Sequence, residues 1–193
     1  QKWQHTQHVR VRSATGPLKD RLAAVNGRAD VYACDYENLP WLIDHWGDKW
    51  VVLTNEAATD FRVMTAPIDR PGEWTELVPH VPGRRITSVE AFADHLVLHE
   101  WADAQPRIRV LFRDGTERTV HGADEPHDLE LDANPEWRAA TVRYVVQSLT
   151  RPVTVYEEDV RSGERAVLKQ TPVPAVDLQA YASERLWATS PDG

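Results

Sequence analysis

The chain of 193 residues carries 22 Lys and Arg against 30 Asp and Glu, which gives a formal net charge of −8. Hydrophobic residues make up 41% and charged residues 27%, a composition typical of one globular domain, or two at most, and not of a disordered chain. Because phosphate binding needs a basic face, the acidic balance argues against a nucleic-acid partner. No apolar run approaches the roughly 18–20 residues of a membrane-spanning helix, so we expect no membrane partner.

The cysteine content and the ends of the chain indicate the cellular compartment of the protein and the boundaries of the sequence. The start of the chain is polar and shows no signal peptide. Cys34 is the single cysteine and cannot form an internal disulfide, so we expect a reducing compartment, the cytoplasm. The chain begins without Met and stops at Asp192 and Gly193, a turn dipeptide, so we expect both ends to be boundaries inside a longer protein.

Strand signals dominate the pattern, because 13 prolines spread through the chain leave little room for long helices. Only residues 18–25 and 178–184 could form short helical turns, and the first could equally be a strand. Residues 1–40 predict an incomplete leading blade or rearranged strands. From residue 41 on, short apolar runs bounded by turn residues recur as a repeat of three units.

Each unit predicts four strands. The first unit has them at 41–44, 50–54, 61–66 and 74–78, the second at 87–92, 95–99, 108–112 and 116–120, and the third at 127–132, 142–146, 153–160 and 164–168. The turn before the fourth strand contains Gly72, Gly115 or Gly163, which are 43 and then 48 residues apart.

Four short antiparallel strands in about 45 residues are typical of a β-propeller blade. We therefore predict an all-β fold, a partial β-propeller of about three to four blades, with three blades in residues 41–170. One blade cannot bury its faces alone, so neighbouring blades must cover it. The alternative is an antiparallel sandwich with evenly spaced strands. Residues 171–193 predict a connection to a further domain.

Catalytic and cofactor-binding motifs are missing from the sequence, so we assign no catalytic or cofactor-binding residue. None of the six serines lies in a Gly-x-Ser-x-Gly elbow, and there is no phosphate-binding glycine loop and no His-Glu-x-x-His motif. Cys34 stands beside Asp35, whose charge would raise the pKa of the thiol and disfavour a nucleophile.

The histidines do not predict a metal site. His95 and His99 share one face of a strand but lie roughly 13 Å apart at the usual rise per residue, too far to bind one ion. The pairs His5 with His8 and His121 with His127 lack suitable neighbours. We expect no metal.

The acidic clusters lie beside turns, where solvated charge is the simplest interpretation; they are Glu157, Glu158 and Asp159, and Asp124 with Glu125. A sialidase-like glycosidase is disfavoured, because only the turn at 113–116 has an Asp-Gly-Thr core and the flanking residues of an Asp box are missing. The eight tryptophans predict packing between blades, with a peptide-binding aromatic surface as the alternative.

The later part of the chain resembles the propeller of the prolyl oligopeptidase family of serine peptidases, and within it the oligopeptidase B (protease II) branch. The stretches that carry the resemblance are 61–67, 94–98, 106–110, 134–137, 148–152, 155–165, 168–174 and 181–193. In that family the last stretch leaves the final blade and enters the α/β-hydrolase domain. The resemblance covers residues 44–193, and the first forty residues match poorly.

The resemblance implies a serine peptidase whose Ser-Asp-His triad lies in a hydrolase domain outside this chain, so this chain alone would be non-catalytic. The propeller would gate the access of short peptides, and the hydrolase domain of the same protein would be its partner. A net charge of −8 agrees with short, basic peptides as substrates. The alternative is a stand-alone propeller or sandwich that acts as a protein-interaction scaffold. An open set of blades exposes faces and strand edges, so we also expect self-association.

Overall fold

The computed structural model describes residues 41–120 and 122–191. The predictions that lie outside these residues are the leading blade at 1–40, the helical turn at 18–25, Cys34, His5, His8 and His121.

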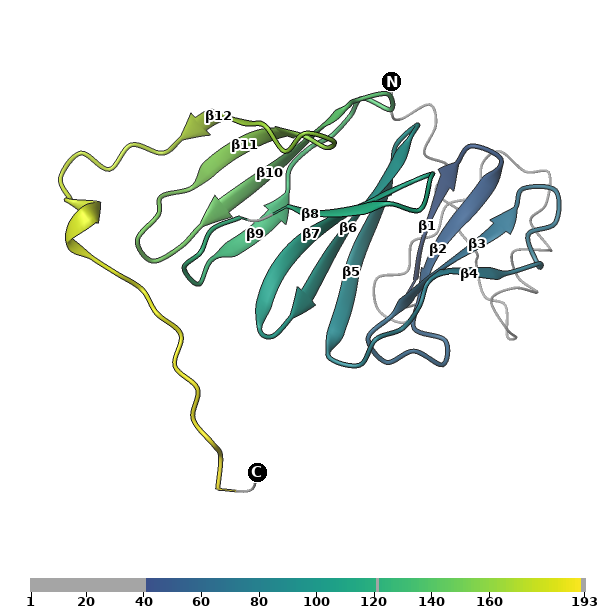
Figure 1. Cartoon of the computed structure of the whole chain (residues 1–193), viewed down its shortest axis with the longest axis horizontal. Coiled ribbons are helices and arrows are strands. Elements are labelled where there is room, and N and C mark those ends of the chain that lie inside the picture. The colour runs from purple at the N-terminus through teal and green to yellow at the C-terminus, as the bar shows by residue number, and fades with distance from the viewer. Residues whose placement is uncertain (1–40, 121, 192–193) are drawn as a thin grey trace, which may run out of the picture.

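The described chain folds into three sheets of four antiparallel strands, each hydrogen-bonded in chain order (Figure 1). Blade 1 contains β1 (Trp41–Trp46), β2 (Lys49–Thr54), β3 (Arg62–Pro67) and β4 (Thr75–Val78). Blade 2 contains β5 (Arg84–Ala91), β6 (His95–Ala102), β7 (Gln105–Phe112) and β8 (Glu117–Val120). Blade 3 contains β9 (Asp128–Leu131), β10 (Thr141–Gln147), β11 (Thr154–Asp159) and β12 (Arg165–Gln170).

Each observed strand overlaps a strand predicted from the repeat, so the prediction of an all-β chain built from four-stranded blades is confirmed. The three sheets follow one another with blade 2 between blades 1 and 3, as blades of a propeller do, whereas a sandwich consists of two sheets (Figure 1). A short 3₁₀ helix, Leu178–Ala180, falls inside the helical turn predicted at 178–184. None of the described residues belongs to a helix with the length and apolar content needed to cross a membrane.

The turns before β8 and β12 differ in length but share a glycine with positive φ and an aspartate that accepts a backbone N–H, which explains part of the repeat. Gly115 and Gly163 have φ values of 82° and 79°, a region that side chains disfavour and glycine tolerates. Asp114, directly before Gly115, accepts the backbone N–H of Thr116 at 2.9 Å. Asp159, four residues before Gly163, accepts the backbone N–H of Ser162 at 2.7 Å. The Asp-Gly-Thr fragment at 113–116 is therefore a strand connection.

Apolar side chains form two clusters, one on each face of blade 2. In β6, Leu96 and Leu98 belong to the cluster shared with blade 1, while Val97 between them belongs to the cluster shared with blade 3. All three side chains have no exposed surface. The middle strands of blade 2 are thus hydrophobic on both faces because a blade lies against each face.

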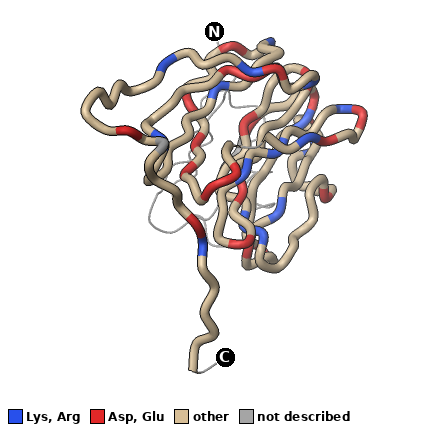
Figure 2. Tube along the Cα trace, turned by 60° about the vertical axis from the view of Figure 1, so that its left-hand side comes forward, with Lys and Arg blue, Asp and Glu red and all other residues tan. Residues whose placement is uncertain are grey.

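The face of blade 3 that points away from blade 2 is mostly polar. Cross-strand pairing places Arg143 beside Glu157, and they form an ion pair with an N–O distance of 2.7 Å. Val145 and Val155 are paired apolar residues on the same face. Figure 2 shows that basic and acidic residues are interspersed along the chain. This face therefore has a mixed surface, unlike the two apolar faces of blade 2.

Leu98 tests whether the packing between blades stabilises the fold. Leu98→Ala should lower the free energy of unfolding by about 2–5 kcal/mol, because it removes buried methyl groups and leaves a cavity between blades 1 and 2. Urea unfolding followed by circular dichroism measures the change. Val167→Ala, at a residue 57% exposed on β12, is the control and should cost about 0.5 kcal/mol or less. Equal effects of the two substitutions would contradict the assignment of Leu98 to a core.

Candidate functional site between the blades

The first strands of blades 1 and 2, β1 and β5, are joined by a buried carboxylate. Asp44 on β1 is 8% exposed, and its Oδ2 accepts the backbone N–H of Ala91 at the end of β5, at 2.9 Å. Its Oδ1 accepts the N–H of His45 at 2.7 Å. A buried acid is tolerated here because backbone donors satisfy both of its oxygens.

A second polar group lies on the face of blade 2 that looks toward blade 1. The guanidinium of Arg109 on β7 donates from Nε and Nη2 to Oε1 of Glu100, at 3.0 and 2.5 Å, and from Nη1 to Oε2 of Glu117, at 2.8 Å. Burial disfavours the charge of Arg109, but its bonds and attraction to the two carboxylates outweigh burial and raise its pKa. Oε2 of Glu100 is buried and has no partner among the described residues.

Blades 2 and 3 are connected by a third polar group, centred on Glu158 of β11. Its Oε2 accepts the hydroxyl of Tyr144 at 2.6 Å, and its Oε1 accepts Nη2 of Arg118 from β8. Burial raises the pKa of Tyr144 above its ordinary value, and the hydrogen bond to Glu158 raises it further, against a smaller opposing effect of Arg165. The Arg118 bond crosses the interface and joins the two blades.

This arrangement corrects the expectation that residues 157–159 carry only solvated charge. Glu158 is 2% exposed, because the alternation of β11 turns every second side chain toward blade 2. Glu157 and Asp159 point the other way and bond Arg143 and the turn at 161–162. At the other predicted acidic cluster, Glu125 pairs with Arg151 at 2.9 Å.

The predicted histidines take packing and hydrogen-bonding roles. His95 is 2% exposed and stacks on Phe92 with ring centroids 4.6 Å apart. His99 bonds the hydroxyl of Thr87 through Nδ1 at 2.5 Å and the carbonyl oxygen of Leu129 in blade 3 through Nε2 at 2.7 Å. Nε2 must therefore be the protonated nitrogen when His99 is neutral.

The remaining histidine that the structure describes among the predicted pairs is His127, which bonds the carbonyl oxygen of Glu125 at 2.7 Å. Within residues 41–120 and 122–191, no three His, Cys, Asp or Glu side chains gather in a way that could hold a metal ion.

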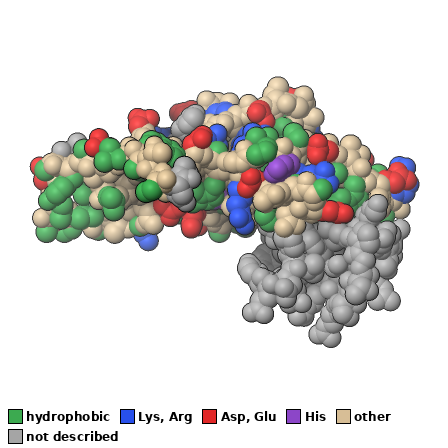
Figure 3. Space-filling model, turned by 90° about the horizontal axis from the view of Figure 1, so that it is seen from below, with side chains coloured by type: hydrophobic (Ala, Val, Ile, Leu, Met, Phe, Trp, Pro, Cys, Tyr) green, Lys and Arg blue, Asp and Glu red, His purple; other side chains and the backbone are tan. Residues whose placement is uncertain are grey.

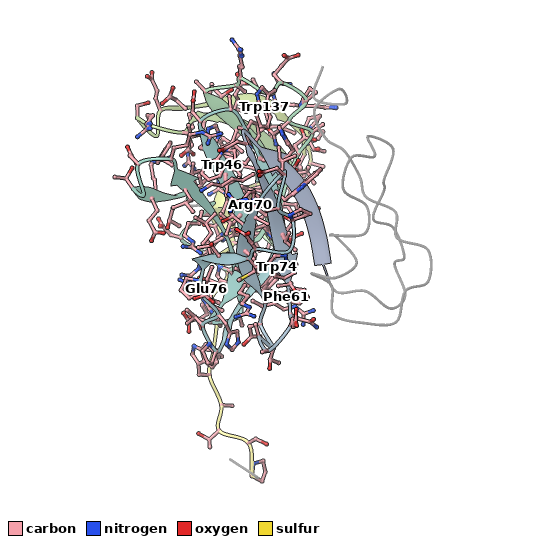
Figure 4. All side chains as sticks on the ribbon, turned by 90° about the vertical axis from the view of Figure 1, so that its right-hand side faces the viewer. Trp46, Phe61, Arg70, Trp74, Glu76 and Trp137 are labelled. Carbon is pink, nitrogen blue, oxygen red and sulfur yellow. The ribbon has the colours of Figure 1, made fainter. Side chains whose placement is uncertain are left out.

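Some of the described tryptophans pack between blades and others are exposed to solvent. Trp46 is buried in the cluster between blades 1 and 2, with Trp137 packed against that cluster, whereas Trp74 donates from Nε1 to the carbonyl oxygen of Pro71 at 2.9 Å (Figure 4). Trp101 and Trp187 are exposed. The described tryptophans therefore do not form one continuous aromatic surface, and packing between blades applies to only some of them.

Two hollows border these groups. A groove of about 600 Å³ lies between blades 1 and 2, with Trp46, Arg109 and Arg113 in its wall. A second hollow of about 450 Å³ lies between blade 3 and the C-terminal segment (residues 171–191), and includes Arg151 and Tyr181. Figure 3 looks at the end from which the C-terminal segment leaves and shows hydrophobic side chains gathered on the blade 3 side.

Sequence reasoning missed Glu100, Arg109, Arg113 and Tyr144. Strand alternation could have identified Glu100 and Arg109 as inward-facing. Glu100 lies two residues after Leu98 and four after Leu96, and Arg109 lies two residues before Leu111, all of which are buried. A charge at an inward position needs a buried partner. No comparable signal marks Arg113, because its contacts come from turns distant in sequence.

The buried phenol of Tyr144 predicts a loss of stability at alkaline pH. Above about pH 10 the tyrosines of the unfolded chain ionise while Tyr144 in the folded chain stays neutral, so its contribution to stability is full below that pH and falls as pH rises. The slope from this residue is up to about 1.4 kcal/mol per pH unit.

Urea unfolding at pH 8 and pH 10.5 measures the effect. Tyr144→Phe loses the hydrogen bond to Glu158 at both pH values but should show a shallower decline between them. Tyr181→Phe, at a residue 64% exposed, should decline as the natural chain does. An unchanged decline in Tyr144→Phe would rule out the raised pKa.

Comparison with known proteins identifies the family. The family described as "Prolyl oligopeptidase, N-terminal beta-propeller domain" matches residues 3–171. The chain is 37% identical over 174 residues to dipeptidyl aminopeptidase BI of Pseudoxanthomonas mexicana, covering 89% of this chain and 24% of that protein. It is 24% identical over 152 residues to Protease 2 of Moraxella lacunata, covering 78% of this chain and 22% of that protein. The chain thus spans about a quarter of the length of these curated relatives.

Solved structures agree. Oligopeptidase B from Trypanosoma brucei, in a closed form with covalently bound antipain, matches with a TM-score of 0.71 at 30% identity and covers 79% of this chain and 23% of that one. Oligopeptidase B from Leishmania major shows the same fold, with a TM-score of 0.73 at 23% identity over 86% of this chain and 26% of that one. The resemblance predicted from the sequence is confirmed, but the expectation that the first forty residues match poorly is wrong, because the family match begins at residue 3. The chain belongs to the family of prolyl oligopeptidase N-terminal β-propeller domains.

Proposed function

We propose that this chain is the non-catalytic propeller of an oligopeptidase-B-like serine peptidase and that it gates the access of peptides to a hydrolase domain. The observation that carries the proposal is the row of three four-stranded blades, similar in fold to oligopeptidase B from Trypanosoma brucei. The catalytic serine, histidine and aspartate would come from the hydrolase domain, because the sequence of this chain holds no Gly-x-Ser-x-Gly motif.

A propeller can exclude large substrates only if its blades stay together. The contacts that cross between blades in this chain support such a role: the Asp44 bond to Ala91, the Arg118 bond to Glu158 and the His99 bond to Leu129. Apolar clusters fill both faces of blade 2 between these bonds. A stiff wall of this kind would admit a flexible peptide and exclude a folded protein.

The C-terminal segment supports a neighbouring domain as partner. It runs away from the three sheets in Figure 1, and Leu186 and Trp187 on it are 80% and 74% exposed. Arg185 holds it to the blades by donating to the carbonyl oxygen of Asp103, in the turn between β6 and β7. Apolar side chains so exposed are typical of a surface that another domain covers. We assign this contact to the hydrolase domain.

The substrate class and the compartment belong to the same proposal. A net charge of −8 would attract short basic peptides, and a single cysteine is consistent with a reducing cytoplasm.

Peptide hydrolysis tests the assignment. The 193-residue chain by itself should not cleave arginine-containing peptides, whereas the longer protein that carries it should cleave them and lose this activity with a serine-directed inhibitor. Inhibitor-sensitive cleavage by the isolated chain would refute the non-catalytic role.

In the longer protein, gating can be measured separately from peptidase activity by comparing the cleavage rates of a small and a large substrate. A ten-residue arginine peptide should be cleaved about tenfold faster or more than the same sequence inside a folded protein loop, a difference of about 1.4 kcal/mol in barrier. Equal rates, with serine-type activity retained, would refute gating while leaving the peptidase assignment standing.

We further propose that copies of this chain associate through β12. Among the described strands β12 pairs with β11 alone, and Val167 and Leu168 on it are 57% and 49% exposed, so it offers an open edge with apolar side chains. Sedimentation velocity over a concentration series should show a rising mean mass. Leu168→Lys should reduce the rise, whereas Leu149→Lys, in the loop before β11 and 94% exposed, should not. A single monomeric species at all concentrations would disprove this association.

A further inference from the structure

The groove between blades 1 and 2 lies at one end of the strands. Its wall includes Lys49 after the β1–β2 turn, and Arg113 and Gly115 from the β7–β8 turn. The C-terminal segment contacts the opposite end of β7, because Arg185 bonds Asp103 just before that strand begins. The eight residues of β7 separate the two ends by roughly 23 Å at the usual rise per residue.

Arg113 is held in this groove on three sides. Its Nε donates to the carbonyl oxygen of Ala93 at 2.8 Å, and its guanidinium carbon lies 4.2 Å from the centre of the Trp46 ring. A Cβ atom on Gly47 would come within 3.1 Å of its Nη2, so the missing side chain of Gly47 makes room for the guanidinium. The orientation of Arg113 is therefore set before any ligand arrives.

The outer nitrogens of Arg113 have no acceptor among the described residues, and no carboxylate there pairs with it. The neighbouring Arg109 differs, because Glu100 and Glu117 engage three of its nitrogens. Two parallel N–H donors of a fixed guanidinium match the two oxygens of a carboxylate, and such bidentate pairs are the strong ones.

The rest of the wall indicates what would carry that carboxylate. Leu77, Pro79 and Leu111 supply an apolar surface, and Lys49 adds a second positive charge. Asp48 and Glu117 also line the groove. Their carboxylates would repel an anion with several charges, but they could accept hydrogen bonds from the backbone N–H groups of a peptide ligand. A single carboxylate attached to an apolar residue and an amide, as at the end of a peptide, fits these features together.

We propose that the groove binds the free C-terminal carboxylate of a short peptide, with Arg113 as its bidentate partner and the last side chain against Leu77, Pro79 and Leu111. Trp46 orients Arg113, and Lys49 adds attraction. All the residues that carry this inference are described residues of this chain, so the inference goes beyond the proposed function and stands whether or not the chain belongs to an active peptidase.

Isothermal titration of the 193-residue chain with N-acetyl-Ala-Leu tests the site against the C-terminal amide of the same dipeptide. The free acid should bind at least about tenfold more tightly than the amide, which is about 1.4 kcal/mol. Equal binding of the two forms, or no binding of the acid at millimolar concentration, would overturn the proposal. Inorganic phosphate should not displace the acid; competition at equal concentration would show a general anion site and also overturn it.

Variants locate the binding. Arg113→Gln should weaken the acid about tenfold or more and leave the weak binding of the amide unchanged, and Arg113→Lys should fall between, because charge remains while the bidentate geometry is lost. The matched control is Arg85→Gln, which removes an arginine lying 5.5 Å from the Phe61 ring and outside the groove wall, and it should bind as the natural chain does.

Thermal unfolding checks that each variant is folded. Should Arg113→Gln fail to fold, Lys49→Gln, at an exposed residue, provides the second test and should weaken the acid but not the amide. If the folded Arg113→Gln variant binds the acid with full affinity, the peptide does not bind at Arg113 and the proposal is wrong. If Arg113→Gln does not fold, full affinity in Lys49→Gln has the same meaning.

Discussion

The structure depends on one constraint: a four-stranded sheet has two faces, and a blade can be stable only where its neighbours cover them. Blade 2 shows this most fully, since Leu98 on one face of β6 and Val97 on the other are both completely buried in separate clusters. Because blade 2 contributes to both cores, a change in its packing affects blade 1 or blade 3 as well. The blades therefore act as a continuous wall.

Charges buried in that wall follow the same alternation. Every second side chain of a strand points into the packed interface. A carboxylate at such a position must accept a hydrogen bond, because a buried charge without a partner lowers the stability of the fold. Glu158 finds Tyr144 and Arg118, and Glu100 finds Arg109. The Glu158 group also crosses from one blade to the next, so it sets which faces meet. Apolar packing alone is less directional and would specify that register less strictly.

Function in such a fold belongs to the ends of the blades, where turns and connecting segments leave the packed sheets. At one end the C-terminal segment carries exposed Leu186 and Trp187, suited to contact with another domain. At the other end Arg113 lies on Trp46 with its outer nitrogens directed to no described acceptor. For the first end we propose a hydrolase domain as partner, whereas the role of the second end is inferred from the contacts of its own residues alone.

The sequence by itself determined the repeat, the strands and the family, because these follow from local patterns: alternation along each strand, a glycine in the turn before each fourth strand, and stretches such as residues 155–165. It did not show that Glu158 is buried, that His99 reaches Leu129, or that Arg113 and Trp46 meet. Those facts depend on which blade faces lie together, and residues tens of positions apart come into contact only when the sheets pack. Local periodicity specifies the strands of a blade, and only the tertiary structure decides what each blade touches.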